Sequence, residues 1–363
     1  MTPSPRPAPL GRQAGFSLIE LMVGLTIGMI AAIVIIQVMS VFEAQRRSTT
    51  GSADAQTNGG IALYSISRDL QMAGYPLTPA TDSPLECTTF TSNIAGITTL
   101  SPVSITNGTA TSSVPASDTI TVRYGKSDLG GATAAITFWD AANKRATVGS
   151  NLGCKLNDIL VVISGSSCAI TKATAVSAAG ASPITVDLDN ATLAAQGANI
   201  SCLGEWHEVV YAVDQSTGNL TRQENIYPTP GAGAANPNTV GIVNIQAQYG
   251  ISGSATSNQV TSWVSASGGT WAAPTVPNRN LIKAVRLAVI ARNAKIEQEA
   301  TTAACSSTTA ANPAGLCAWE GSAGSPAPTV DLSPGNPSWN KYHYRVFGTI
   351  VPLRNVMWAK DTL

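Results

Sequence analysis

The hydrophobic positions first single out a long apolar run near the start of the chain. Leu21 to Phe42 is a stretch of 22 residues without a charged side chain, bounded by Glu20 and Glu43. About 20 apolar residues span a bilayer as a helix, whereas the apolar core of a cleaved secretory signal has roughly 7–15. The run is therefore expected to be a retained transmembrane helix over residues 21–42.

The residues after this run predict that the helix continues. Leu63, Ile66 and Leu70 recur at three- and four-residue spacing, which is typical of the buried face of an amphipathic helix. Arg68 and Asp69 are expected to point away from that face. The amphipathic pattern thus predicts a second helical half that packs against a globular domain.

Glycines set the limits of this helix. Gly74, followed by Tyr75 and a proline, predicts its end. Gly51 and the pair at 59–60 leave open whether it is broken in the middle. An unbroken helix over residues 16–73 would be about 87 Å long at about 1.5 Å per residue.

From residue 76 onward the pattern changes to short alternating runs that predict strands. The first of them alternates cleanly, with Ile120, Val122 and Tyr124 on one face. Val213 to Leu220 lies between two strand-like runs and predicts a hairpin turn. Strands are expected over residues 119–124, 158–163, 184–188, 206–213, 240–249, 281–292 and 342–351.

Within the run at 240–249, the alternation predicts one apolar and one polar face. Val243, Ile245, Ala247 and Tyr249 are expected on the apolar face, opposite three amide side chains at 244, 246 and 248.

Long connections rich in Ser, Thr, Ala, Gly and Pro separate the strands. They exceed the usual loop length and are expected to be functional surface or mobile loops. The predicted fold class is α+β, with a long N-terminal helix packed under one β-rich head over residues 76–363. The connections cover residues 91–117, 172–182, 229–239, 252–277 and 301–340.

The composition of the chain argues against several classes of function. Lys+Arg and Asp+Glu number 21 each among 363 residues, and charged residues make up only 12%. This balance gives no electrostatic basis for a nucleic-acid partner. No metalloprotease, serine-hydrolase or phosphate-loop motif occurs, and the two histidines leave little room for metal or acid–base chemistry. We expect no enzyme activity, no cofactor and no metal site.

Three features could support binding, and each has a structural alternative. His207 and Glu208 are neighbours, but on a strand they point to opposite faces, so His207 is expected to be a surface strand residue. His343 is likewise expected to face solvent. Asp214 and the hydroxyls after it could bind calcium, although an ordinary turn explains them better. Tryptophans in the long loops indicate either an interface or loops packed onto the head: Trp263, Trp271, Trp319 and Trp339.

The cysteines indicate the compartment. All six follow the apolar run, and an even number without a C-x-x-C pair suits an oxidising environment, so the head is expected outside the inner membrane. Six cysteines allow 15 pairings. Local spacing suggests bridges between Cys154 and Cys168 and between Cys305 and Cys317, with connectivity left open.

The segment before the apolar run carries the most specific motif. Gly15-Phe16-Ser17-Leu18-Ile19-Glu20 resembles the type IV prepilin signature, in which a prepilin peptidase cuts after the glycine and the new terminal amine is methylated. The resemblance implies a leader peptide over residues 1–15, longer than many pilin leaders, and a mature helix over 16–75. It implies that Phe16 is the N-methylated first residue.

A physical argument for the role of Glu20 does not depend on the resemblance. A carboxylate at the edge of an apolar helix is energetically costly and usually faces a partner. The amine freed at Phe16 could neutralise it, and the resemblance implies that Glu20 has a role in assembly. The alternative is an interfacial carboxylate that caps the helix.

Scattered motifs of the head narrow the resemblance to minor pilins of the PilW type. They are the hairpin from Asp214 to Arg222 and two C-terminal segments, 344–347 and 351–355. The resemblance implies a low-abundance subunit that primes pilus assembly and sits near the fibre tip. The implied partners are the prepilin peptidase, other minor pilins and the major pilin.

The same resemblance implies two locations. The precursor would cross the inner membrane once with its head in the periplasm, and the mature subunit would lie in the surface pilus that serves twitching motility. A type II secretion pseudopilin and a tip adhesin, which would bind a surface through its long loops, remain alternatives.

Overall fold

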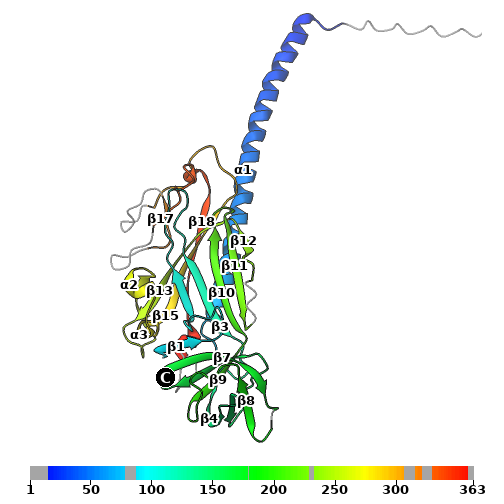
Figure 1. Cartoon of the computed structure of the whole chain (residues 1–363). Coiled ribbons are helices and arrows are strands. Elements are labelled where there is room, and N and C mark those ends of the chain that lie inside the picture. The colour runs from blue at the N-terminus through cyan, green and yellow to red at the C-terminus, as the bar shows by residue number, and fades with distance from the viewer. Residues whose placement is uncertain are drawn as a thin grey trace, which may run out of the picture. The chain divides into compact units, whose positions relative to one another are not determined.

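The computed structural model describes residues 15–77, 87–178, 180–228, 233–305, 315–320 and 329–358. The chain forms two compact units that meet between Thr50 and Gly51. Helix α1, Leu18–Met72, belongs to both units and runs without a break through Gly51 and the two glycines at 59–60 (Figure 1). Except for Gly15, the expected leader lies outside the described residues.

The first unit is the N-terminal part of α1. From Gly15 to Phe42 every side chain is exposed, although most are large and apolar. Among the described residues, α1 is the one helix that is long and apolar enough to cross a membrane, judged by length and composition. Within this part of α1, the described apolar side chains are thus open to a partner or to lipid.

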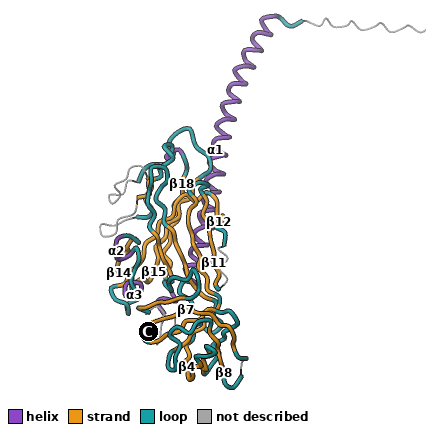
Figure 2. The backbone as a smooth tube through the Cα atoms, viewed as in Figure 1, coloured by secondary structure: helices purple, strands orange, loops and turns teal. Residues whose placement is uncertain are grey.

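The second unit begins with the last turns of α1, whose apolar face lies in the main core. Figure 2 shows this part of α1 beside the strands of the head. Ala62, Ile66 and Leu70 are fully buried there among residues of two sheets. The helix ends at Met72, and Gly74 adopts a positive φ of 80°, as the sequence predicted.

The first sheet has five strands in the order β12-β11-β10-β3-β2, and the second has four in the order β14-β13-β15-β18. Both are antiparallel. The strands of the first sheet are β2 (Val103–Thr106), β3 (Thr119–Gly125), β10 (Trp206–Asp214), β11 (Asn219–Tyr227) and β12 (Asn236–Val240). Those of the second are β13 (Ile242–Ser252), β14 (Val260–Ser265), β15 (Ile282–Arg292) and β18 (Tyr344–Pro352).

Strand β13 is buried on both faces, so the polar face predicted at 240–249 is covered as well as the apolar one. A register shift between Ile242 and Asn244 also moves Val243 into a different core cluster from Ile245. The amides of Asn244 and Gln246 donate hydrogen bonds to the carbonyl of Ala116, at 2.6 and 3.2 Å. A loop segment that crosses the sheet thus satisfies polar groups that would otherwise need water.

Six strands close into a barrel, because the order β7-β6-β9-β4-β5-β8 is completed by pairing of β7 with β8. A separate apolar cluster fills it, and β1 pairs in parallel with β7 from outside. The strands are β1 (Thr89–Ser92), β4 (Thr133–Asp140), β5 (Arg145–Val148), β6 (Ile159–Ser164), β7 (Ser167–Val176), β8 (Ile184–Leu188) and β9 (Asn199–Gly204).

The barrel is inserted between two neighbouring strands of the five-stranded sheet. Strand β3 ends at Gly125 and β10 begins at Trp206, and these two residues are register partners. The barrel segment therefore leaves and re-enters the sheet at one point (Figure 1).

Several expected loops contain short elements, which corrects the prediction of structureless connections. Segment 91–117 contains β2, and 172–182 includes the end of β7. Part of β12 falls within 229–239. The last two segments contain β14 and also α2 (Gly268–Trp271), α3 (Val276–Arg279), β16 (Gly315–Cys317), β17 (Thr329–Asp331) and a 3₁₀ helix (Trp339–Lys341). The final described element is α4 (Arg354–Trp358).

All six cysteines form disulfides. Cys305 pairs with Cys317, the pairing that local spacing suggested. The expected bridge between Cys154 and Cys168 is wrong, because Cys154 pairs with Cys202 and Cys168 with Cys87. Strand pairing explains the difference: β6 and β9 are neighbours at one end of the barrel, and β1 lies beside β7, so partners distant in sequence are adjacent in space.

Candidate functional site

The N-terminal motif starts at Gly15, the first residue that the structure describes. Phe16 is 87% exposed, and α1 starts two residues later. The Oε2 atom of Glu20 accepts the backbone N–H of Ser17 at 3.1 Å. The carboxylate therefore folds back toward the start of the helix, where unpaired N–H groups and the helix dipole favour a negative charge. This contact is the capping arrangement that the sequence left as an alternative.

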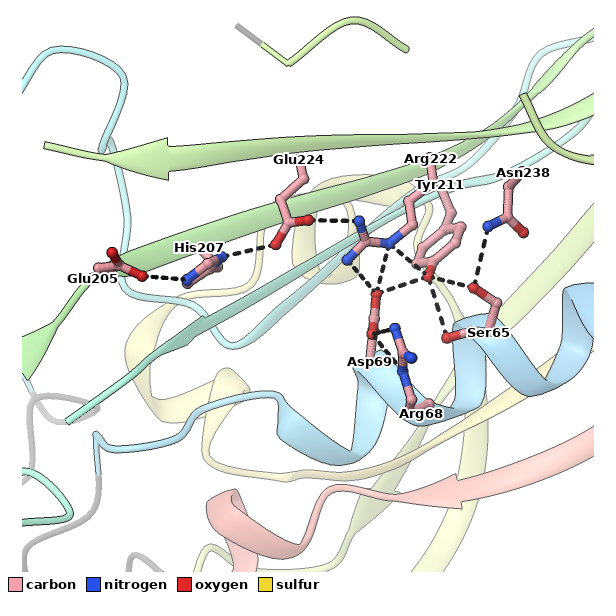
Figure 3. Close-up of polar contacts among 9 residues, drawn as sticks. All are labelled: Ser65, Arg68, Asp69, Glu205, His207, Tyr211, Arg222, Glu224 and Asn238. Atoms are coloured by element: carbon pink, nitrogen blue, oxygen red, sulfur yellow. Dashed lines mark hydrogen bonds and ion pairs between the residues drawn. The ribbon is translucent and has the colours of Figure 1, made fainter. Parts of the chain in front are cut away.

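A second polar site joins the C-terminal part of α1 to the β10–β11 hairpin (Figure 3). We call it the helix–hairpin cluster, and all its members belong to the second compact unit. Its members are Ser65, Arg68, Asp69, Glu205, His207, Tyr211, Arg222, Glu224 and Asn238.

Asp69 is the centre of the helix–hairpin cluster, and it is only 3% exposed. Its Oδ2 atom accepts the hydroxyl of Tyr211 at 2.7 Å and the Nε–H of Arg222 at 3.0 Å. The Nη2 atom of Arg222 lies at 3.0 Å from the same oxygen. Its Oδ1 atom accepts Nη2 of Arg68 at 3.2 Å. A buried charge is tolerated only when it is paired and hydrogen-bonded, and here every oxygen has partners.

The hairpin extends the cluster along one face. Arg222 donates through Nη1 to Glu224 at 2.6 Å, and the other oxygen of Glu224 lies 2.8 Å from Nδ1 of His207. The ring of His207 stacks on Tyr124, with centroids 5.0 Å apart. Its Nε2 atom lies 3.6 Å from Glu205, too far for a hydrogen bond. A series of polar and charged side chains thus runs from α1 to the start of β10.

The pKa shifts follow from burial and from these pairs. Burial raises the pKa of the Tyr211 hydroxyl, which keeps it a donor. Burial opposes the charge of Arg222, but its bond to Glu224 and the charge of Asp69 raise its pKa overall. Burial likewise opposes ionisation of Glu224, yet Arg222 and His207 lower the pKa of Glu224. The cluster is therefore a network of charged, hydrogen-bonded side chains that attaches α1 to the β10–β11 hairpin.

Two sequence expectations are wrong at this site. Asp69 was expected to point away from the apolar face, and it is buried because Tyr211 and Arg222 compensate its charge. His207 was expected at the surface, and it is buried under Tyr124 and beside Glu224. A sequence signal existed, since Arg222 and Glu224 alternate in phase with buried Leu220 and so share its face.

Two further contacts fasten α1, and both involve C-terminal segments that the sequence singled out. Phe347 on β18 lies against Gly59, where an added Cβ would meet its ring. Asn355 on α4 donates through Nδ2 to the carbonyls of Gln71 and Ala73, at 3.2 Å each. The amide thus satisfies carbonyls at the end of the helix that lack helical partners.

The remaining candidates have structural roles. The carboxylate of Asp214 accepts the backbone N–H and hydroxyl of Ser216 and the hydroxyl of Thr217, as in an ordinary turn. His343 is half-buried near Glu297, which corrects its expected exposure. Within the described ranges, no group of three or more His, Cys, Asp or Glu could hold a metal ion.

The loop tryptophans pack onto the head. Trp339 is buried in the third core cluster, and Trp271 packs against the main core. Trp263 and Trp319 both stack on Arg286, at 4.3 and 5.1 Å from its guanidinium carbon.

Comparison with known proteins gives two family matches. Residues 210–355 match the model of the type IV pilus-assembly protein W family, and residues 10–36 match the prokaryotic N-terminal methylation motif. Among solved structures, a type IV-like pilin from Thermus thermophilus is similar, with 11% sequence identity and a TM-score of 0.36. The alignment covers 83% of this chain and 96% of that one, and the likeness is too distant to add to the assignment. No curated protein matches significantly.

The first family match covers the hairpin and the strands that bear the fastening contacts, including Arg222, Phe347 and Asn355. The second covers the residues around Gly15 and Glu20. Over these two stretches the chain is similar to minor pilins of the PilW type and to proteins with an N-terminal methylation motif.

Proposed function

We propose that the chain is made as a membrane-anchored precursor, cleaved between Gly15 and Phe16, methylated on the new amine, and placed near the pilus tip. The observation that carries this is the exposed apolar surface of α1 directly after the Gly15–Glu20 motif. A helix with this surface needs lipid before assembly and other helices afterwards. The subunit acts as a structural protein, with no catalytic step of its own.

Glu20 would set the register of the subunit in the fibre. Its carboxylate already lies at the first turn of α1, against the N–H of Ser17. Cleavage adds a cationic amine one residue earlier, at Phe16. In the apolar interior of a helix bundle such a carboxylate needs a cation, which is the amine of its own chain or of a neighbouring subunit.

The cysteines support a periplasmic head before assembly. Three disulfides occur in the second unit, and disulfides persist in oxidising compartments such as the periplasm. In this arrangement the leader stays on the cytoplasmic side, where the prepilin peptidase would reach Gly15. The head would then meet other minor pilins and the major pilin as α1 leaves the membrane.

The first test is a deletion strain in which pilus retraction is also disabled. Surface pili are counted by electron microscopy. Few or no pili are expected if the protein primes assembly. Because pili are not retracted in this strain, a low count reports a defect in assembly. Normal numbers would contradict priming. Loss of surface attachment with normal numbers would favour an adhesin, and loss of exoprotein release would favour a secretion pseudopilin.

The second test separates the role of Glu20 from folding. Glu20→Ala is expected to lower pilus counts in the retraction-disabled strain while the precursor reaches normal levels. Glu43→Ala is the matched control, because it removes a carboxylate from the other end of the apolar run. Equal pilus counts in the two variants would contradict a special role for Glu20.

A further inference from the structure

A polar cavity of about 190 Å³ lies where the β10–β11 turn meets β13, β15 and β18. Its size suits a ligand of about one small ring. None of the contacts of the helix–hairpin cluster involves its lining residues.

Arg292 is the single charged residue that lines this cavity. Its guanidinium carbon lies 4.6 Å from the ring centroid of Tyr342, and it bonds the hydroxyl of Tyr344. No carboxylate among the described residues forms an ion pair with it. Its fork is therefore held in place by two aromatic residues while N–H donors remain for an anion.

The turn supplies acceptors to the same cavity. Ser216 and Thr217 line it, and both donate their hydroxyl hydrogens to Asp214, at 2.6 and 2.7 Å. Their oxygens are left as acceptors for a ligand that carries hydroxyl groups. Asp214 itself does not line the cavity, and its exposed carboxylate is occupied by three hydrogen bonds.

The wall also includes apolar side chains and amides. Val243 and Leu332 are buried and lie beside the amides of Gln215 and Asn336. A cavity with one fixed cation, hydroxyl acceptors, amides and apolar contacts matches a ring that has a carboxylate, several hydroxyls and an apolar face.

We propose that this cavity binds an acidic sugar, with the carboxylate on Arg292 and ring hydroxyls on Ser216 and Thr217. A neutral sugar leaves Arg292 without its partner, and an acidic peptide leaves the acceptors of the turn unused. The proposal is independent of the role in pilus assembly, because it concerns the head of a single chain.

The test uses the full-length chain in detergent micelles and isothermal titration with sodium glucuronate. Saturable binding of glucuronate is expected, with glucose and an aspartyl dipeptide binding at least about tenfold more weakly, since each lacks part of the match. Equal binding of glucose, stronger binding of the dipeptide, or no binding of glucuronate would overturn the proposal.

Substitutions of arginines inside and outside the cavity test whether glucuronate binds there. Arg292→Gln is expected to weaken glucuronate binding at least about tenfold, and Arg292→Lys less, because a charge remains without the fork. Arg286→Gln is the matched control, since Arg286 lies on the same strand and also stacks on aromatic rings, but outside the cavity. Equal losses in Arg292→Gln and Arg286→Gln would refute the assignment.

Asn336→Ala keeps the test decisive if Arg292→Gln fails to fold. Thermal unfolding of each variant is measured first. Asn336→Ala is expected to fold and to weaken binding severalfold, and unchanged affinity in that variant would count against the site.

Discussion

At the scale of single residues, Asp69 shows how helical spacing and charge can disagree. It lies seven residues after Ala62, three after Ile66 and four before Ala73, all of them fully buried. Spacing alone places Asp69 on the buried face, and its charge argued for the opposite. The structure resolves the conflict through partners from β10 and β11 that no local pattern identifies.

We expect Asp69→Asn to lower the free energy of unfolding by about 3 kcal/mol. The amide keeps the shape of the side chain, but it removes one of the two carboxylates that pair with the largely buried guanidinium of Arg222. The measurement is urea unfolding of the full-length chain in detergent micelles, followed by tryptophan fluorescence.

Arg68→Ala is the control for this prediction. The side chain of Arg68 is 59% exposed, and exposed ion pairs contribute roughly 0–1 kcal/mol. Its removal is expected to change stability little. Equal effects of Arg68→Ala and Asp69→Asn would show that the buried pairing with Arg222 does not fasten the helix.

The two candidate sites differ in how far sequence could reveal them. The motif from Gly15 to Glu20 is continuous, so its residues can be recognised without a fold. The helix–hairpin cluster joins residues more than 140 positions apart, such as Asp69 and Tyr211, and exists only once α1 meets the hairpin. Its members looked like ordinary solvated charges on separate elements.

At the scale of elements, the hydrophobic pattern of the sequence predicted many of the strands. Strands β3, β6, β8, β10, β13, β15 and β18 lie within a few residues of their expected bounds. Two of the missed strands lack a clear apolar face. β14 and β17 are rich in small polar residues, and their strand conformation depends on pairing with β13 and β16.

The contact between α1 and β18 gives a prediction about two adjacent glycines. Gly59→Ala is expected to destabilise the head by about 1–3 kcal/mol, because the new methyl group would overlap the ring of Phe347 and force it to move. Gly60→Ala meets nothing within 4 Å and is expected to stabilise the helix by up to about 1 kcal/mol.

Thermal unfolding of the two alanine variants, side by side, checks this. Phe347→Leu in the Gly59→Ala background is expected to recover part of the loss, because the smaller side chain makes room. If both glycine variants gain stability, the helix does not approach β18 as closely as the contact requires.

At the scale of the whole molecule, the inserted barrel was not predicted. The sequence indicated one elaborated head, and the structure has one compact unit over residues 51–363. Yet residues 126–205 close on themselves around their own core, and the family match begins only at residue 210. Barrel closure depends on pairing of β7 with β8, which alternation does not reveal.

The barrel is expected to unfold together with the rest of the head. Strand β6 is buried on both faces: Ile159, Val161 and Ile163 join the main core, and Leu160 and Val162 fill the barrel. Leu160→Ala should cost about 2–5 kcal/mol and speed hydrogen exchange in the barrel and in β13 and β15 alike. Faster exchange confined to the barrel would show that it opens alone.

The fastenings of α1 also decide how the subunit responds to tension. A fibre under load pulls each subunit along its helix, and the head resists through Phe347 at Gly59, the pairing at Asp69 and the amide of Asn355 near Ala73. These anchors are spread along the last turns of α1 and are loaded in shear, so the force is shared among them. Bonds loaded together break at a higher force than bonds broken one after another. The contacts between α1 and the head are therefore expected to resist tension along the helix.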